Sequence, residues 1–223
     1  PDYMHDGSYV ECKGCDTADM VPDPEPAAAP LEDILLDPPN CDLSKPFVNA
    51  AGSGTLSPGN YNGITSSGDL TLSPGLYCLK GGFENTKGNV VGNDITLYFM
   101  NSTTVKLNNN FNEKKIENSY GLTLSAASGD NFGNPPAVRG VLMYFAKPST
   151  VQINGGSNNQ ISGTVYAPTS DITLNGGTDL ETPPVLATQI IASFIKVNGG
   201  ANLEMNLEGA EFPQTPALID LLK

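Results

Sequence analysis

The stretch "VQINGGSNNQISGTVYAPTSDITLNGG", residues 151–177, contains the same phrase twice. An apolar-polar-apolar triplet runs directly into Asn-Gly-Gly, and a third copy, "IKVNGG", begins at Ile195. The three asparagines are 21 and 23 residues apart in the sequence: Asn154, Asn175 and Asn198. A turn that returns about every twenty residues is typical of proteins in which each unit stacks on the one before.

Further triplets of the same kind begin at Leu70, Ile95, Val105 and Leu122. Apolar residues at positions i and i+2 lie on one face of a strand, so each triplet predicts a short strand with its polar middle residue toward solvent. These middle residues are Thr71, Thr96, Lys106, Thr123, Gln152, Thr173 and Lys196. The runs "GVLMYFA" from 140, "SGTVYAP" from 162 and "TQIIASFI" from 188 are strand-like as well.

Two groups of turns separate these strands. The phrase Leu-Ser-Pro-Gly-x-Tyr occurs twice, with Pro58-Gly59 and Pro74-Gly75 as strong turn signals, because proline presets φ and glycine accepts positive φ. The second group consists of the Asn-Gly pairs, since asparagine tolerates the left-handed region better than other non-glycine residues. These pairs are Asn154-Gly155, Asn175-Gly176 and Asn198-Gly199.

The pattern predicts an all-β protein, with a right-handed parallel β-helix (β-solenoid) over residues 47–212. The asparagines are expected to stack in register, about one strand spacing apart, and to bond to one another. Residues 1–46, rich in proline and acid, are expected to form an extended arm or linker, and residues 213–223 a tail with a short helix. An antiparallel β-sandwich, which also has many short strands, is the alternative.

Composition excludes some partners. The chain has 11 Lys and Arg against 24 Asp and Glu, a net charge of −13, so we expect no nucleic acid to bind. No stretch approaches the roughly 18 apolar residues that span a bilayer, which predicts no membrane span. The chain begins at Pro1 rather than Met, and we expect it to be a processed portion of something longer.

Four cysteines are present: Cys12, Cys15, Cys41 and Cys78. An even number favours structural disulfides in an oxidising compartment. "CKGC" at 12–15 also fits half a zinc site or a redox motif, although zinc would require more ligands than the single histidine, His5, supplies. The residues leave these three interpretations open.

Candidates for catalysis are few. His5 lies in the arm, which excludes a Ser-His-Asp device in the body, and we predict no enzyme activity and no cofactor. Two groups of acidic residues keep alternatives open. Carboxylate pairs of a glycosidase would come from Asp171, Asp179, Glu181, Glu204 and Glu208. Calcium ligands would come from Asp94, Asp130 and Asp179 in Gly/Asn-rich turns. A glycan binder would need exposed aromatics. Tyr144 and Tyr166 are the candidates, although we expect both to be core or corner residues.

The order of these phrases resembles the C-terminal region of TadG-like proteins, which are associated with tight-adherence (Flp) pilus systems. The resemblance spans about residues 41–205. It rests on two PGxY phrases followed by glycines and on a later G-x-φ-Y-A-P phrase. The matching positions are Pro58, Gly59, Tyr61, Gly63, Pro74, Gly75, Tyr77, Gly81, Gly82, Gly163, Tyr166, Ala167 and Pro168.

The resemblance implies an exported, extracellular or cell-surface protein without enzymatic activity that has a structural or adhesive role. Its partners would be pilus or surface subunits, or further copies stacked end to end or laterally. A carbohydrate-binding or carbohydrate-active β-helix is the alternative function. In this family a cysteine after the first PGxY pairs with an upstream cysteine. Here Asn62 holds that place and Cys78 follows the second PGxY, which implies a Cys41–Cys78 disulfide.

Overall fold

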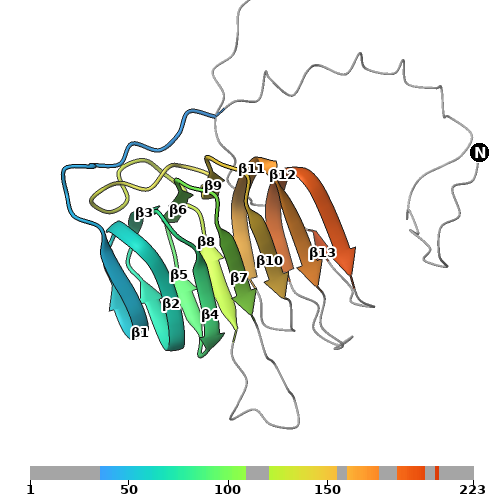
Figure 1. Ribbon diagram of the computed structural model, residues 1–223, viewed down its shortest axis with the longest axis horizontal. Coiled ribbons are helices and arrows are strands. Elements are labelled where there is room, and N and C mark those ends of the chain that lie inside the picture. Colours follow the sequence, from blue (N-terminus) through green and yellow to red (C-terminus); the bar gives the residue numbers. More distant parts are fainter. Residues whose placement is uncertain (1–35, 109–120, 155–159, 176–184, 199–203, 206–223) are drawn as a thin grey trace, which may run out of the picture. The chain divides into compact units, whose positions relative to one another are not determined.

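The computed structural model describes residues 36–108, 121–154, 160–175, 185–198 and 204–205. The chain divides into two compact units, residues 1–37 and residues 38–223. Every element described below belongs to the second unit (Figure 1). The described part of the chain contains no helix with the length and hydropathy that a bilayer-spanning segment requires.

Within the described residues all regular structure is β. The strands are β1 (Val48–Leu56), β2 (Gly59–Leu72), β3 (Gly75–Leu79), β4 (Phe83–Lys87), β5 (Val90–Gly92), β6 (Ile95–Phe99), β7 (Thr104–Asn108), β8 (Leu122–Ser125), β9 (Val141–Phe145), β10 (Thr150–Asn154), β11 (Gln160–Asn175), β12 (Val185–Asn198) and β13 (Glu204–Met205). β11 and β12 are long because each joins runs that the sequence pattern predicts as separate strands, whereas β2 extends the predicted triplet at Leu70 back to Gly59.

The strands pair in three parallel ladders, and β2, β11 and β12 contribute a different segment to each. The first ladder runs β2-β3-β6-β9-β11-β12. The second runs β2-β4-β7-β10-β11-β12. The third runs β2-β5-β8-β11-β12-β13. Successive strands along the chain belong to the first, second and third ladder in turn.

All strand pairings between described residues are parallel, so the antiparallel sandwich is wrong. The pairings also close on themselves: the order β10-β7-β4-β2-β3-β6-β9-β11 returns to β10 through the β10–β11 pair. The fold is therefore an all-β, parallel arrangement that contains a closed ring of eight strands.

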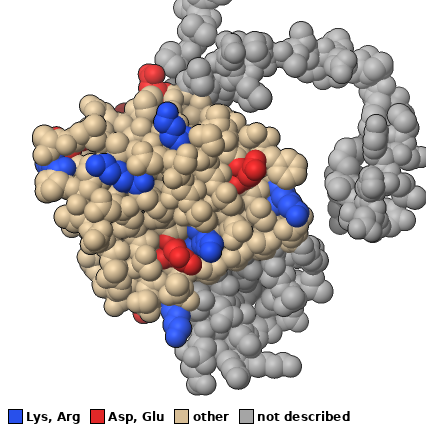
Figure 2. Space-filling model, in the orientation of Figure 1, with Lys and Arg blue, Asp and Glu red and all other residues tan. Residues whose placement is uncertain are grey.

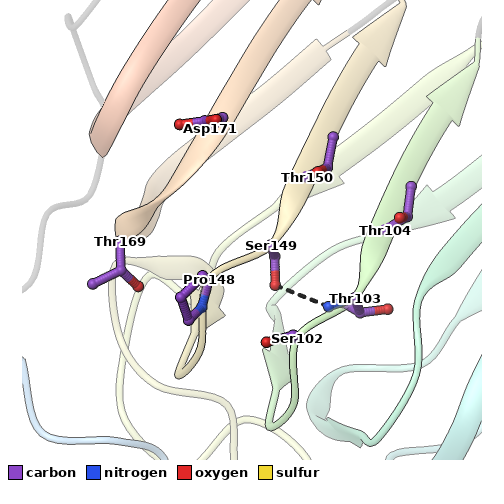
Figure 3. A pocket seen from close by; sticks show the side chains of 8 residues that line it. All are labelled: Ser102, Thr103, Thr104, Pro148, Ser149, Thr150, Thr169 and Asp171. Atoms are coloured by element: carbon purple, nitrogen blue, oxygen red, sulfur yellow. Dashed lines mark hydrogen bonds between the residues drawn. The ribbon is translucent and has the colours of Figure 1, made fainter.

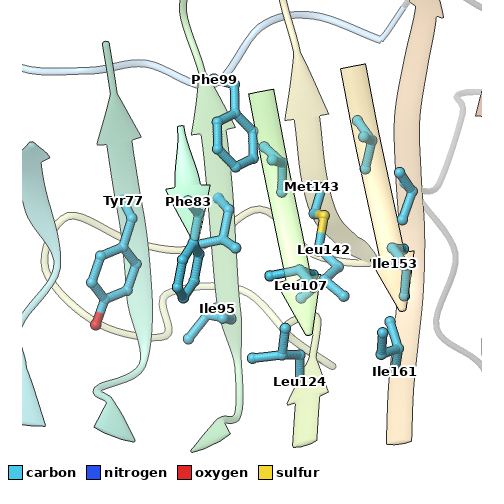
Figure 4. Close-up of a cluster of buried hydrophobic side chains, with 14 of the residues drawn as sticks. Tyr77, Phe83, Ile95, Phe99, Leu107, Leu124, Leu142, Met143, Ile153 and Ile161 are labelled. Atoms are coloured by element: carbon cyan, nitrogen blue, oxygen red, sulfur yellow. The ribbon is translucent and has the colours of Figure 1, made fainter. Parts of the chain in front are cut away.

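The apolar residues of the triplets fill the interior between the ladders (Figure 4). In the second ladder Val105, Val151 and Ile172 are in register and fully buried. In the first ladder the rings of Phe99 and Phe145 stack with centroids 4.5 Å apart. Full burial of one such aliphatic or aromatic side chain stabilises the fold by about 1.5–3 kcal/mol. A single turn of chain cannot bury these groups, so the interior exists only because strands stack.

The two Pro-Gly turns have the predicted backbone geometry, because Gly59 and Gly75 have φ of 151° and 137°. A Cβ on Gly75 would collide with the ring of Pro58 and the carbonyl oxygen of Pro135. The tyrosine of each phrase closes its own turn, since its hydroxyl donates to the serine carbonyl four residues back. The oxygen–oxygen distances are 2.6 Å from Tyr61 to Ser57 and 2.7 Å from Tyr77 to Ser73.

A covering segment, residues 126–140, lies against the outward side of the first ladder. The Leu76 amide donates to the carbonyl of Pro135 at 2.9 Å, which ties the segment to β3. The triplet pattern predicts that Thr96 faces solvent. This prediction is wrong, because the covering segment buries Thr96 completely. Its hydroxyl accepts from the Val138 amide at 2.8 Å and donates to the Val141 carbonyl at 2.7 Å.

Candidate functional site

The outward side of the second ladder, from β7 to β12, has no such cover among the described residues. It comprises β7, β10, residues 171–175 of β11 and residues 194–198 of β12 (Figure 1). The first three segments share one burial pattern, in which two fully buried positions alternate with outward ones. We call the outward positions the polar face: Thr104, Lys106, Thr150, Gln152, Asp171, Thr173, Phe194 and Lys196.

Pairing places the residues of the polar face in two rows across the four strands. Lys106, Gln152, Thr173 and Lys196 follow one another in register, and four of the seven predicted outward residues therefore form one row. Neighbouring strands lie about 4.8 Å apart, so the row spans about 15 Å. The rows place side chains at fixed intervals on a rigid backbone.

An asparagine ladder borders the polar face at the carboxyl ends of its strands. The Asn175 side-chain amide donates to Oδ1 of Asn154 at 2.6 Å, and that of Asn198 donates to Oδ1 of Asn175 at 3.0 Å. The predicted in-register stack of these three asparagines is thus confirmed. The glycines that follow them, Gly155, Gly176 and Gly199, lie outside the described residues.

The ladder extends to two asparagines that the repeat did not reveal. The Asn154 side-chain amide donates to Oδ1 of Asn108 at 2.6 Å. The backbone amide of Asn108 in turn donates to Oδ1 of Asn85 at 2.6 Å. No Asn-Gly-Gly phrase marks Asn85 or Asn108. Asn108 is the last residue of β7, whereas Asn85 is the middle residue of β4. Asn85 is fully buried, and these bonds satisfy polar groups that would otherwise destabilise the interior.

At the opposite end of the same strands a second polar ladder uses hydroxyl groups. Ser149 Oγ accepts from the Thr103 amide at 3.2 Å, and Ser170 Oγ accepts from the Ser149 amide at 3.1 Å. Ser149 and Ser170 are both buried. Side-chain hydrogen bonds therefore fix both ends of the polar face, and the serine ladder was not predicted from the sequence.

Beside the serine ladder the surface is hollowed (Figure 3). The depression has a volume of about 460 Å³, and it is lined mainly by hydroxyl groups: Ser102, Thr103, Thr104, Pro148, Ser149, Thr150, Thr169 and Asp171. Asp171 is its only carboxylate. The lining offers neutral hydrogen-bonding groups at the edge of the polar face.

Charges are sparse on the side of the molecule shown in Figure 2, where isolated Lys, Arg, Asp and Glu side chains are separated by uncharged surface. The charged members of the row across the polar face are Lys106 and Lys196. Strand pairing places Glu84 of β4 opposite Lys106 of β7. The excess of acid in the whole chain is therefore not concentrated in this row. Contacts here would depend on shape and hydrogen bonds more than on long-range attraction.

The tyrosines considered for glycan stacking are buried. Tyr144 and Tyr166 have only 7% and 2% of their surface exposed. They pack in a row with Tyr98 along the first ladder. Tyr98 and Tyr144 meet edge to face with ring centroids 5.4 Å apart, and the rings of Tyr144 and Tyr166 are tilted by 36° with centroids 4.9 Å apart. Burial raises the pKa of Tyr98. They pack as structural side chains and do not present a surface for sugars.

Two of the four cysteines lie within the described residues. Cys41 and Cys78 form a disulfide, and the bond joins the segment before β1 to β3. Asn60 supports the same junction, because its side-chain amide donates to the carbonyls of Asp42 at 2.8 Å and Lys45 at 3.0 Å. Cys12 and Cys15 lie outside the described residues, as does His5.

The acidic candidates do not converge where the structure describes them. Asp171 is exposed at the hollow, whereas Asp94 lies in a turn with φ 56° and accepts from the Ser128 amide at 3.3 Å. Asp130 is exposed, Asp179, Glu181 and Glu208 lie outside the described residues, and the side chain of Glu204 is not described. Among the described residues no group of three or more His, Cys, Asp or Glu is placed to hold a metal ion.

The geometry thus offers a surface of hydroxyl, amide and charged groups with one exposed aromatic ring, Phe194, bordered at both strand ends by hydrogen-bonded ladders. Its predicted parts are the outward row and three of the asparagines. Comparison with protein-family models, with curated proteins and with solved structures gives no match to this chain.

Proposed function

We propose that residues 47–212 wind as a right-handed β-solenoid that serves as an exported, non-enzymatic structural or adhesive module of a TadG-like, Flp-associated surface system. Successive strands join the three parallel ladders in a repeating order, which supports the solenoid winding. Right-handed crossovers are the rule where parallel strands are connected, which supports the hand. The Cys41–Cys78 disulfide is compatible with export to an oxidising compartment.

The observation that carries the adhesive role is the polar face itself. Its strands stay in register from β7 to β12, and the inward positions of β7, β10 and β11 are buried. A partner that docks there meets side chains whose spacing is set by parallel strand pairing, so no backbone rearrangement of this face is needed on association. In this proposal the occupant is a pilus or surface subunit.

The test replaces outward residues in cells that naturally carry the protein. A strain lacking it is complemented with wild type or with the triple variant Thr150→Glu, Gln152→Glu and Thr173→Glu. The matched control places the same three charges on the third ladder, at Thr71→Glu, Thr123→Glu and Gln160→Glu. We expect attachment to surfaces to fall to the level of the deletion strain only for the triple variant. Wild-type attachment by a correctly displayed triple variant would contradict the role of the face.

A glycan-binding role is the second candidate, favoured by the hollow of about 460 Å³ with its hydroxyl lining and Asp171. It ranks second because Tyr144 and Tyr166 are buried and supply no stacking surface. Calorimetry against a panel of oligosaccharides separates the candidates. Binding that is abolished by Thr169→Trp at the hollow, with attachment unaffected by the triple variant, would replace the adhesive proposal with this one.

A further inference from the structure

The exposed large hydrophobic side chains of the described residues all lie toward one end or the other of the stacked strands. They are Leu43, Val48, Phe194, Ile195 and Val197. Leu43 and Val48 belong to the β1 end, whereas the other three belong to β12, toward the opposite end of the ladders (Figure 1). Apolar surface that gathers in two places, and is absent between them, indicates sites of association.

The interior of the second ladder is left uncovered on β12 by the described residues. Ile172 is fully buried, whereas Ile195, its partner in register, is 43% exposed. In the neighbouring inward row Leu174 is 4% exposed and Val197 is 58% exposed. The exposed side chains therefore belong to rows that are buried everywhere else in this ladder from β7 onward.

Both end strands also have an unpaired backbone edge within the described part of the chain. β1 pairs with β2, and β12 pairs with β11 along its length but with β13 only at Val185 and Leu186. Because all these pairs are parallel, the free edges of β1 and β12 face opposite ways along one stack. A strand that runs in the direction of β1 would continue the ladder beyond β12.

The two edges lack the usual protection against pairing with another chain. Natural edge strands commonly carry charged side chains or proline for this purpose. β1 has the sequence "VNAAGSGTL" and contains neither, and Lys196 is the single charged residue of β12. The net charge of −13 makes copies of the chain repel at long range, but the acidic residues that cause it lie elsewhere.

The inward rows of the second ladder bring small residues to one end and large residues to the other. One row begins at Ala50 of β1 and ends at Ile195 of β12, with every position between them buried. A second copy in the same register would place its Ala50 beside Ile195. Its Gly52 would lie beside Val197, and a Cβ at Gly52 would have no atom within 4 Å, which leaves room for the valine.

The first ladder offers the converse match. An inward row begins at Val48 of β1, which is 49% exposed, and ends at Ala192 of β12, which is partly buried against the core. The same register places Val48 of the second copy beside Ala192. Large side chains meet small ones in both ladders, as close packing between two layers requires.

We propose that a second copy of the chain stacks head to tail on this one, with residues 49–52 of its β1 pairing in parallel with residues 194–197 of β12. Such a contact joins two different surfaces and does not close on itself, so repeated addition produces a filament. The family resemblance leaves end-to-end and lateral stacking open, and the strand edges select the first. The proposal goes beyond the adhesive role of the polar face and rests on the described strand pairings.

Two variants of the full chain test the contact, because each disables one end and keeps the other. Val48→Asp/Ala50→Asp charges the β1 end, and Ile195→Asp/Val197→Asp charges the β12 end, at side chains that are partly exposed in the single chain. In light scattering the mass of the wild type should rise with protein concentration. Each variant alone should associate more weakly by about tenfold or more. Their equimolar mixture should form a species of twice the chain mass and nothing larger.

The matched control Val91→Asp/Thr123→Asp adds the same charge at outward positions of β5 and β8, in the middle of the third ladder. It should associate as the wild type does. X-ray scattering of the wild type adds a measurement that needs no variant. End-to-end addition lengthens the particle at constant cross-section, whereas lateral addition widens it.

Two results would overturn the stacking. A wild type that stays monomeric throughout the concentration series would mean that the ends are covered by another segment or a different partner. A mixture of the two variants that forms nothing larger than either alone, while the wild type associates, would assign association to another surface. Neither result depends on attachment to surfaces, so failure of the stacking is distinguishable from failure of the proposed function.

Discussion

The tripeptide Ile-Thr-Leu occurs in two places with opposite fates for its threonine. In β6 Thr96 is fully buried and bonded to the covering segment, whereas in β11 Thr173 is half-buried in the polar face. Both have buried apolar neighbours on either side, so the local pattern is satisfied equally. The contrast shows that the alternation of apolar and polar residues along a strand decides which side chains face inward. Whether the outward side chains are exposed to solvent depends on a segment distant in the sequence.

The largest expected effect concerns what holds the N-terminal segment to the first ladder. Replacing the disulfide by Cys41→Ala/Cys78→Ala should lower the free energy of unfolding by about 4 kcal/mol, because the bond closes a loop between cysteines 37 residues apart. Guanidinium unfolding without reductant measures it. An unchanged midpoint would mean that the covered ladder needs no covalent tie.

The matched threonines give the sharpest form of the comparison. Thr96→Val should lower the unfolding free energy by about 1–3 kcal/mol, because the Val138 amide and Val141 carbonyl lose their partner in a buried site. Thr173→Val should change it by less than about 0.5 kcal/mol. Thermal unfolding of both variants provides the measurement, and equal losses would show that the two outward sides do not differ.

The asparagine ladder should contribute less per residue. Asn175→Ala removes the bond to Asn154 and the bond from Asn198, with an expected loss of about 1–2 kcal/mol. Gln152→Ala, in the adjacent outward row, is the control and should have a smaller effect. If Gln152→Ala destabilises as much as Asn175→Ala, the ladder does not pin the border of the polar face.

The smallest effect distinguishes the two PGxY tyrosines by pH. Burial raises the pKa of Tyr77, with the nearby Tyr61 adding to the shift, and burial raises the pKa of Tyr61 as well. A raised folded-state pKa favours the protonated phenol, so the stability is intact below the unfolded pKa of about 10 and falls as pH rises above it.

Unfolding at pH values on either side of 10 therefore should show a loss at high pH. Tyr77→Phe should reduce that pH-dependent loss more than Tyr61→Phe does, because Tyr77 is the more deeply buried ring. Absorbance of tyrosinate during the titration checks the assignment. Identical pH profiles for the two variants would remove the difference between the two copies of the phrase.

The parallel β architecture, the Pro-Gly turns and the stacked asparagines follow from local rules. A period of two sets the inward side of each strand, and returning turns set the register of Asn154, Asn175 and Asn198. The β-solenoid winding and the pilus association remain predictions. The Cys41–Cys78 bond, which family resemblance implied, is present in the structure.

Other features had no sequence signal. Asn85 and Asn108 belong to the ladder without the phrase that marks the others, and Ser149 and Ser170 form a ladder from residues that are common in any turn. The contacts of Tyr144 with Tyr166 are likewise tertiary, because neighbouring strands place their rings against one another.

By itself the sequence determined the strands, their inward residues and the repeat of their turns, since these depend on backbone preference and on side-chain alternation between neighbours. The tertiary structure alone decided that residues 126–140 cover one outward side and leave the polar face open. That choice depends on contacts such as Leu76 to Pro135 and Thr96 to Val138, between residues far apart in the chain. No local pattern encodes such contacts, because their free energy arises only when the stack has brought both partners together.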